Sequence, residues 1–293
     1  MGDYVIRGTA ADGQIRAFAC DVTLSVEEGR MRHDSSPVAT AALGRTMAAA
    51  AMLSCDLKDK DESITISIAG NGPLGKVIAI GDGAGRVRGY VQNPKVDLPP
   101  KSKGHLDVAR AIGIGVMSVI KDLGLKEPYI GTTHLVSSEI GEDLAYYFAE
   151  SEQIPSAVAL SVLMTPEHTV WTAGGYLIQL MPGATEETAA ILEERVKKFP
   201  QLSHFLAEGH TPEEVLAILL ENMDFKNNGQ VPYHFECDCS KHRFANGLAS
   251  LGEKELTTLI EEGQPIETTC NFCGQKYYFT VDELKAIRAG SRR

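Results

Sequence analysis

Four cysteines near the end of the chain form two close pairs. One residue separates Cys237 from Cys239, two residues separate Cys270 from Cys273, and a gap of about 30 residues lies between the pairs. Each pair can close a small chelate ring, and four thiolates are a common donor set for structural zinc. The usual zinc ribbon has two C-x2-C pairs about 15–20 residues apart. The spacing therefore predicts one zinc ion per chain, held in a site that is not a standard ribbon.

Two other states are open to paired cysteines, namely structural disulfides and buried thiols. Residues 1–4 (MGDY) have neither the basic region nor the apolar run of a secretory signal, so we expect a cytoplasmic protein. Paired cysteines in a reducing compartment more often bind metal or react than form permanent bridges. Replacement of one sulfur ligand by His234 or His242, which flank the first pair, is a minor alternative.

The rest of the chain shows no recognisable enzyme motif. Neither G-x-S-x-G nor H-E-x-x-H occurs, and no two histidines have metal-ligand spacing. Residues 70–75 match G-x-G-x-x-G formally, but a strand pattern follows where a dinucleotide site needs a helix, so a turn is predicted. Cys20 and Cys55 are expected to be small core residues, as are the aromatic residues at 146–148. We therefore predict a protein that is not an enzyme.

Composition narrows the possible partners. The 293 residues are enough for about two domains, and 43% of them are hydrophobic. The net charge is −11, from 28 Lys+Arg against 39 Asp+Glu, which disfavours nucleic acid because phosphate binding depends on clustered basic residues. No apolar run is long enough to span a bilayer, so no membrane partner is expected. The negative net charge also favours solubility.

Residues 1–182 are expected to fold as an α+β domain with a largely antiparallel sheet and inserted helices. Asp12-Gly13 between two apolar runs predicts a hairpin, and Pro37 before an alanine-rich run predicts a buried helix. Ser138 is expected to cap a later helix. The predicted strands are 4–8, 14–20, 63–69, 76–80, 86–91, 115–121, 130–137, 158–164 and 170–180, and the predicted helices are 22–30, 37–53 and 138–148.

Residues 183–230 are predicted to be a helical linker. Thr185 and Thr211 begin helices with carboxylates in the first turn, where the helix dipole favours them. The segment holds 4 Lys+Arg and 9 Asp+Glu, giving 4 − 9 = −5. Its apolar residues recur at helical spacing, so this acidic segment must place its apolar face against another surface. Residues 227–230 (NNGQ) are expected to mark its end.

Residues 231–293 are predicted to be a small C-terminal zinc-binding domain. A helix is expected at 250–262, a strand at 276–279, and a last helix after a capping box at 280–283. A domain of about 60 residues is marginally stable from burial alone. A structural zinc ion contributes an apparent ~10–16 kcal/mol near neutral pH, so loss of the metal is expected to unfold this domain.

The chain resembles the Hsp33 family of redox-regulated holdase chaperones. The resemblance extends from about residue 3 to residue 288. It is carried by four motifs, which are ALGRT at 42–46, GGYLIQLMPG at 174–183, FECDCS at 235–240 and CNFC at 270–273.

This resemblance implies a stress-response chaperone that is inactive while reduced and zinc-bound. Oxidation is implied to form disulfides Cys237–Cys239 and Cys270–Cys273, to release zinc and to unfold the linker. The protein is then implied to form a homodimer and to bind unfolding proteins, with residues 1–182 as the chaperone and dimerisation domain. We expect Cys270–Cys273 to close first, since a C-x-C disulfide is more strained.

Two alternatives from other classes stay open at this stage. A zinc-ribbon nucleic-acid binder is possible, although residues 231–293 hold 8 Lys+Arg and 9 Asp+Glu, giving 8 − 9 = −1 with no basic stripe. A dithiol oxidoreductase is possible because C-x-x-C motifs perform that chemistry, but this one lacks the preceding strand–helix setting of thioredoxin-like proteins.

Overall fold

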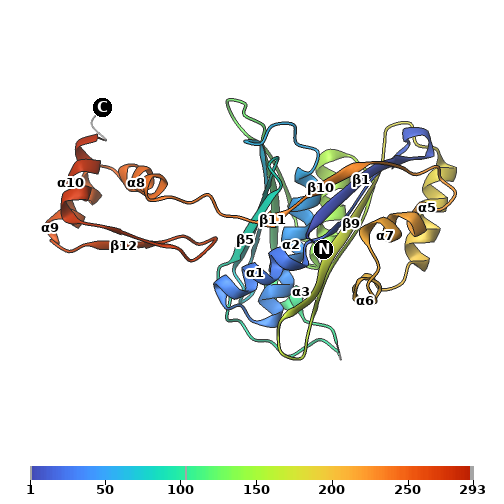
Figure 1. Ribbon diagram of the computed structural model, residues 1–293, viewed down its shortest axis with the longest axis horizontal. Helices are drawn as coiled ribbons and strands as arrows, with labels where there is room; N and C mark the ends of the chain where they lie inside the picture. Colours follow the sequence, from blue (N-terminus) through green and yellow to red (C-terminus); the bar gives the residue numbers. More distant parts are fainter. Residues whose placement is uncertain (1, 103, 291–293) are drawn as a thin grey trace. The chain divides into compact units, whose positions relative to one another are not determined.

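The chain divides into two compact units. The computed structural model describes residues 2–102 and 104–290, and contacts between residues separate a first unit, ending at Glu236, from a second that begins at Cys237. Figure 1 follows the chain from one unit to the other. Across the described residues, no helix is both long and apolar enough to cross a bilayer. The predicted functional division at 182 and 230 stays a prediction, because this structural boundary reports compactness alone.

The first unit contains a five-stranded and a six-stranded sheet (Figure 1). The strand orders are β10-β1-β2-β9-β8 and β11-β5-β4-β3-β6-β7. The described strand pairs are antiparallel except for β11 with β5, which is parallel. The predicted α+β class with a largely antiparallel sheet is confirmed. The strands are β1 (Tyr4–Ala10), β2 (Ile15–Asp21), β3 (Ser63–Gly70), β4 (Lys76–Asp82), β5 (Arg86–Val91), β6 (Gly115–Asp122), β7 (Tyr129–His134), β8 (Ser156–Met164), β9 (Val170–Leu180), β10 (Lys226–Pro232) and β11 (His234–Phe235).

Helix α2 (Pro37–Ser54) lies between the two sheets and forms the centre of the core. It contacts β3, β4 and β5 on one side and β2, β8 and β9 on the other. Ser36 caps its first turn by accepting a hydrogen bond from the Ala39 amide, and Pro37 occupies N1, where its missing N–H costs nothing. Small alanine side chains let both sheets approach the helix closely, so the prediction of a buried helix is confirmed.

Shorter helices connect the strands of the first unit. They are α1 (Thr23–His33), α3 (Val108–Ile112) and α4 (Ile140–Tyr147), with single turns at Ala11–Gly13 and Phe148–Glu152. The prediction that Ser138 caps α4 is wrong. The capping position is Glu139, and Ser138 has a positive φ of 62° with its hydroxyl donating to the Gly113 carbonyl. The side chain therefore fixes the preceding loop instead of the helix.

Other predictions for the first unit agree with the structure. The segment predicted as a turn at 70–75 does connect β3 and β4, with Gly70 ending β3 and residues 71–75 forming the turn. Cys20 and Cys55 are buried, and burial raises the pKa of Cys55 to about 12 and that of Cys20 strongly as well. Both thiols are therefore protonated near neutral pH and chemically inert. Tyr147 and Phe148 are buried in the same core, while Tyr146 is half-buried.

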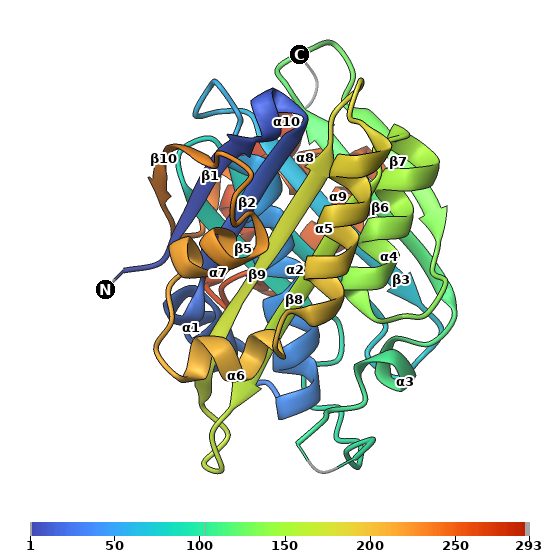
Figure 2. The ribbon, with the colours of Figure 1, turned by 90° about the vertical axis from the view of Figure 1, so that its right-hand side faces the viewer.

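Three helices cover the outer face of the five-stranded sheet (Figure 2). They are α5 (Glu186–Lys198), α6 (Leu202–Ala207) and α7 (Pro212–Leu219). Thr185 accepts a hydrogen bond from the Thr188 amide, and Thr211 with Glu214 completes the predicted capping box. The apolar face predicted for this acidic segment packs on β1, β2 and β9. The helical side chains in this cluster are Leu192, Leu202, Phe205, Leu206, Val215, Leu216 and Leu219.

Strand β10 was not predicted, because its sequence is polar. Residues 227–230 predict a boundary, but β10 pairs with β1 from Tyr4↔Pro232 to Thr9↔Lys226. Lys, Asn, Gly, Gln and Pro have low strand propensity. The edge of β1 therefore imposes the strand through backbone pairing, which sequence periodicity does not reveal.

Up to residue 290, where the described part ends, the second unit has three helices and one hairpin. They are α8 (Lys241–Ala249), α9 (Glu253–Glu261) and α10 (Val281–Gly290), and the hairpin is β12 (Ile266–Thr269) with β13 (Lys276–Phe279). The strand at 276–279 and the capping box of Thr280 and Glu283 are confirmed, whereas α8 was not predicted. The buried centre consists of Leu248, Leu256, Phe279 and Leu284. This core is small, as expected for so short a unit.

The packing of α7 gives a stability prediction. Leu216 is fully buried against the sheet, whereas Ile218 on the same helix is 45% exposed. Leu216→Ala should lower the free energy of unfolding of the first unit by about 2–5 kcal/mol, because it leaves a cavity. Ile218→Ala is the matched control and should change it by less than about 0.5 kcal/mol. Urea denaturation of the reduced protein measures both, and equal effects would contradict the observed packing.

Candidate metal centre

The four cysteines come from two loops that the second unit brings together. Cys237 and Cys239 lie in the extended segment before α8, where Ser240 caps the helix by accepting a hydrogen bond from the Arg243 amide. Cys270 and Cys273 lie in the turn of the β12–β13 hairpin. The Cys270 amide donates to the Gln275 carbonyl, and the Gly274 amide donates to the Cys270 carbonyl. Gly274 has a φ of +73°, which this turn requires and glycine adopts without strain.

The sulfur atoms form one compact group. All four Sγ atoms lie within 4.8 Å of one another. The Sγ atoms of Cys237 and Cys270 are 3.7 Å apart, and those of Cys239 and Cys273 are 3.4 Å apart. A disulfide would need about 2.05 Å, whereas tetrahedral Zn–S bonds of about 2.3 Å place sulfurs roughly 3.8 Å apart. The four residues selected from the sequence are therefore brought together with a spacing that fits a single tetrahedral metal ion.

The electrostatics of the cluster also fit a cation. Burial raises the pKa of Cys237 and of Cys273, and the neighbouring Cys270 sulfur raises that of Cys237 further. Burial also opposes ionisation of Cys239, but hydrogen bonds from Tyr277 and Cys273 outweigh it and lower the pKa of this thiol. Four thiolates this close repel one another, so full ionisation needs a positive charge among them. A divalent ion supplies that charge.

Tyr277 on β13 contacts the cluster directly. Its hydroxyl lies 3.1 Å from Cys239 Sγ and 3.0 Å from the Cys239 carbonyl oxygen, and its ring packs 5.0 Å from that of Phe244. Tyr277 was not singled out from the sequence, which predicts only a strand at 276–279. The signal that would have found it is the alternation of β13, since Tyr277 and Phe279 point to one side of the hairpin and Tyr278 is exposed.

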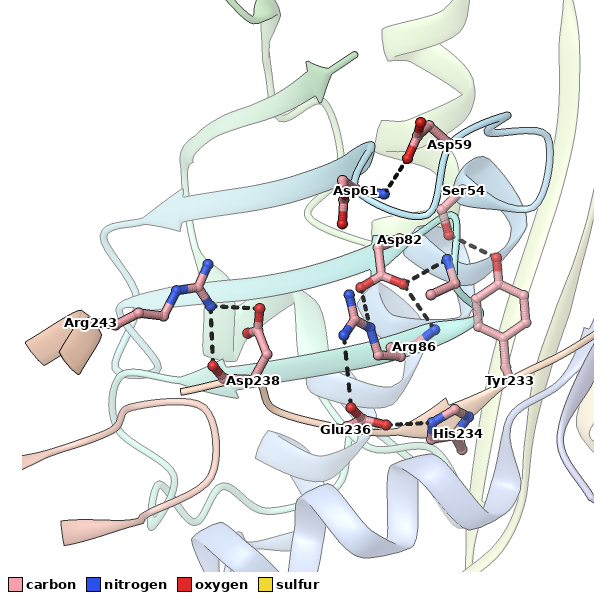
Figure 3. Close-up of polar contacts among 11 residues, drawn as sticks. Ser54, Asp59, Asp61, Asp82, Arg86, Tyr233, His234, Glu236, Asp238 and Arg243 are labelled. Carbon is pink, nitrogen blue, oxygen red and sulfur yellow. Dashed lines mark hydrogen bonds and ion pairs between the residues drawn. The ribbon is translucent and has the colours of Figure 1, made fainter. Parts of the chain in front are cut away.

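Charged residues around the first cysteine pair form ion pairs and do not join the sulfur cluster. Arg243 binds the Asp238 carboxylate at 2.6 Å, and His234 Nε2 lies 2.8 Å from Glu236 Oε2 (Figure 3). Neither His234 nor His242 belongs to the group that could bind a metal. The minor alternative of a histidine ligand therefore has no support in the described residues.

Comparison with known proteins identifies the family. The family described as "Hsp33 protein" matches residues 3–280. The 33 kDa chaperonin of Ruminiclostridium cellulolyticum is 48% identical over 287 residues, covering 98% of each chain. That of Oceanobacillus iheyensis is also 48% identical, covering 98% of this chain and all of its own.

A solved structure agrees with these sequence matches. The structure of the 33 kDa chaperonin (heat shock protein 33 homolog) of Thermotoga maritima superimposes with a TM-score of 0.90 at 38% identity, covering 100% of this chain and 99% of its own. Family membership and a cluster of four cysteines fit a redox-regulated chaperone. The relatives are named as chaperonins and not as enzymes. The chain belongs to the Hsp33 family of chaperones.

Proposed function

We propose that this protein is a redox-regulated holdase chaperone, inactive when reduced and activated by oxidation of its four clustered cysteines. The observation that carries the proposal is the group of four sulfurs within 4.8 Å in a unit with a small apolar core. A sulfur cluster that stabilises such a unit makes its folding depend on the oxidation state of the thiols. Membership of a chaperone family supports protein binding as the output.

Cys237, Cys239, Cys270 and Cys273 are the proposed ligands of one Zn²⁺ per chain. Four sulfurs at this spacing suit zinc, and the bound ion supplies folding energy without redox chemistry of its own. A structural zinc contributes an apparent ~10–16 kcal/mol to a small domain, whereas whole domains are stable by only about 5–15 kcal/mol. Residues 237–293 are therefore proposed to unfold when the ligand set is lost.

Oxidation is proposed to remove the ligands two at a time. A thiolate attacks one oxygen of hydrogen peroxide, which leaves a sulfenic acid and, after protonation, one water molecule. The second thiol of the pair then displaces the hydroxyl, forming the disulfide and a second water. The pairs proposed are Cys237–Cys239 and Cys270–Cys273. Each closure removes two sulfur donors from the cluster, so the site can no longer hold the ion.

Unfolding of the second unit is proposed to release the helical linker at 183–230. In the structure the apolar face of α5 to α7 packs on the five-stranded sheet. The chain that joins these helices to Cys237 runs through β10 and β11, both paired with strands of the first unit. Loss of order after Cys237 is proposed to propagate backwards along this segment, exposing apolar surface on the sheet and the helices.

The exposed surface is proposed to bind unfolding proteins and to support a homodimer. Residues 1–182 are the proposed chaperone and dimerisation domain, 183–230 the linker and 231–293 the redox switch. A cytoplasmic, reducing setting fits cysteines that must stay reduced until stress. Nucleic acid and membranes are not proposed partners, given the net charge of −11 and the absence of a clustered basic stretch.

The central prediction is that protection of a client depends on redox state. Protein treated with peroxide should suppress light scattering by a heat-denaturing enzyme, whereas protein kept in reductant should not. A chromogenic chelator assay of the same samples should detect about one released Zn²⁺ per chain in the peroxide-treated protein, while the reduced protein keeps its zinc. Protection that is equal in both samples, or reduced protein without bound metal, would contradict the proposed switch.

The order of oxidation gives a second prediction. Cys270–Cys273 should close before Cys237–Cys239, because a C-x-x-C ring relaxes to ordinary disulfide geometry and a C-x-C ring is strained. Brief exposure to peroxide, alkylation of free thiols and mass spectrometry of the peptides measure this order. Early closure of the Cys237–Cys239 bridge alone would refute it.

The hydroxyl of Tyr277 is predicted to strengthen metal binding by orienting Cys239. Tyr277→Phe removes the hydrogen bond to this sulfur and should weaken zinc affinity about 10-fold or more, as is usual for partners of metal ligands. The matched control is Tyr278→Phe, because Tyr278 is 57% exposed and its neighbour on the same strand. Competition with a chelator measures both affinities, and equal values for the two variants would exclude the orienting role.

A further inference from the structure

Strand β10 covers an edge of the five-stranded sheet that would otherwise be open. The strand order places β10 outermost, next to β1, so β1 is an interior strand only while β10 is paired. The same continuous stretch of chain then forms β11, which is the outermost strand at one edge of the six-stranded sheet and pairs with β5. We name residues 226–236 the connecting segment. It closes one edge of each sheet and ends at the residue before Cys237.

The two partners in the β1–β10 pair are unequal. In β1 the side chains of Val5 and Ile6 are fully buried, whereas in β10 no residue is buried and most are exposed. A bulge interrupts the pairing between Arg7 and Gly8, and the Asn227 side chain accepts a hydrogen bond from the Gly229 amide within β10 itself. Backbone pairing therefore holds β10, with little contribution from side-chain burial.

Tyr233 is the one buried side chain of the connecting segment. It is 4% exposed and belongs to the main core of the first unit. Its hydroxyl lies 2.9 Å from the Ser54 hydroxyl at the end of α2, and its amide donates to the Asp3 carbonyl. Figure 3 shows the ring reaching Ser54. This side chain anchors the point where the chain passes from one sheet to the other.

The turn between β4 and β5 holds the rest of the segment. The amides of His234 and Glu236 donate to the carbonyls of Gly85 and Val87. The Asp82 carboxylate fixes this turn by accepting from the Ala84 amide and from Arg86 Nε (Figure 3). Arg86 Nη1 also lies 3.8 Å from Glu236 Oε1. These contacts involve only His234 in β11 and Glu236 directly after it, so they secure a short attachment.

We propose that the connecting segment is an internal substitute for a client strand, and that its release opens the edge of β1 to an extended segment of an unfolding protein. A long strand edge with unpaired backbone groups is a template for strand addition, and Arg7, the one charged residue of β1, is already paired with Asp56. The connecting segment already occupies this edge as an antiparallel strand, and we propose the same arrangement for the client segment. This inference rests on the proposed function, since oxidation is what frees the segment.

The edge favours a particular client chemistry. The neighbours of β10 include the two core clusters, since Val231 packs partly against one and Phe225 partly against the other. An extended chain rich in apolar residues would bury more apolar surface there than the polar residues 226–230 do. The edge thus prefers apolar extended segments, which unfolded proteins expose and folded proteins do not.

Hydrogen exchange of β1 tests the inference in the whole protein. On oxidation, amides in the peptide covering residues 4–10 should exchange at least about tenfold faster than in the reduced, zinc-loaded protein, since an interior strand becomes an edge. Adding reduced, carboxymethylated α-lactalbumin, a permanently unfolded chain, should slow that exchange again by about tenfold. If β1 never loses protection, or stays fast while the unfolded chain is bound, the inference is wrong.

A pair of glycine variants tests release without oxidation. Gly85 has a φ of +79°, and a Cβ there would collide with the Pro232 carbonyl oxygen of the connecting segment. Gly124 has a φ of +68°, and a Cβ added there would have nothing within 4 Å. Gly124→Ala therefore introduces the backbone strain without a collision. Reduced Gly85→Ala should show the faster β1 exchange while keeping its zinc, and Gly124→Ala should not. Equal β1 exchange in both variants would overturn the role of the connecting segment.

Tyr233→Ala is the second variant, should Gly85→Ala fail to fold. It removes the anchor without altering the cysteines, so the reduced protein should keep its zinc, expose β1 and suppress client aggregation. Unchanged β1 exchange in folded, zinc-loaded Tyr233→Ala would contradict the anchor. The two levels of the proposal fail separately. Oxidised wild type that protects no client refutes the proposed function, whereas protection without any change in β1 refutes only the edge.

Discussion

The described part of the second unit brings four sulfur atoms within 4.8 Å of one another beside a small apolar core. The core of residues 237–293 centres on four buried side chains, while the first unit has a continuous core around α2. Thiols at this distance repel when ionised and are weak partners when neutral, so the cluster is stable only around a cation. The proposed switch couples the folding of this small unit to the chemistry of its cysteines.

The central helix of the first unit is covered on both sides by strands of the two sheets. Alanine-rich α2 brings the two sheets close together. The strands of both sheets that bury it, β2 to β5 with β8 and β9, all lie before residue 183. The acidic helices α5 to α7 lie on the outside of one sheet, in a cluster of buried residues separate from the core around α2. The two clusters allow the proposed release of α5 to α7 to leave the core around α2 intact.

The features found from the sequence are those encoded locally. The spacing of the cysteines, Pro37 before an alanine run, and Thr211 with Glu214 act within a few residues, and the structure contains each of them. Strand β10 and the contact of Tyr277 with the cysteines were not predicted, because each depends on a partner distant in the sequence. The partner is β1 for β10 and Cys239 for Tyr277. Ser138 was misassigned for a related reason, since its hydroxyl satisfies the distant Gly113 carbonyl in preference to a local helix end.

The polar composition of β10, which prevented its prediction as a strand, fits its position at the edge of the five-stranded sheet. An apolar strand on the edge of β1 would pair too strongly to be displaced, and it would become an aggregation site once released. A strand of Lys, Asn, Gly and Gln satisfies the backbone of β1 and contributes little else. Specific attachment is then concentrated in Tyr233, next to the chain that leads to Cys237. Weak pairing along the strand, with one buried side chain and a short attachment at its end, fits the reversible cover that we propose.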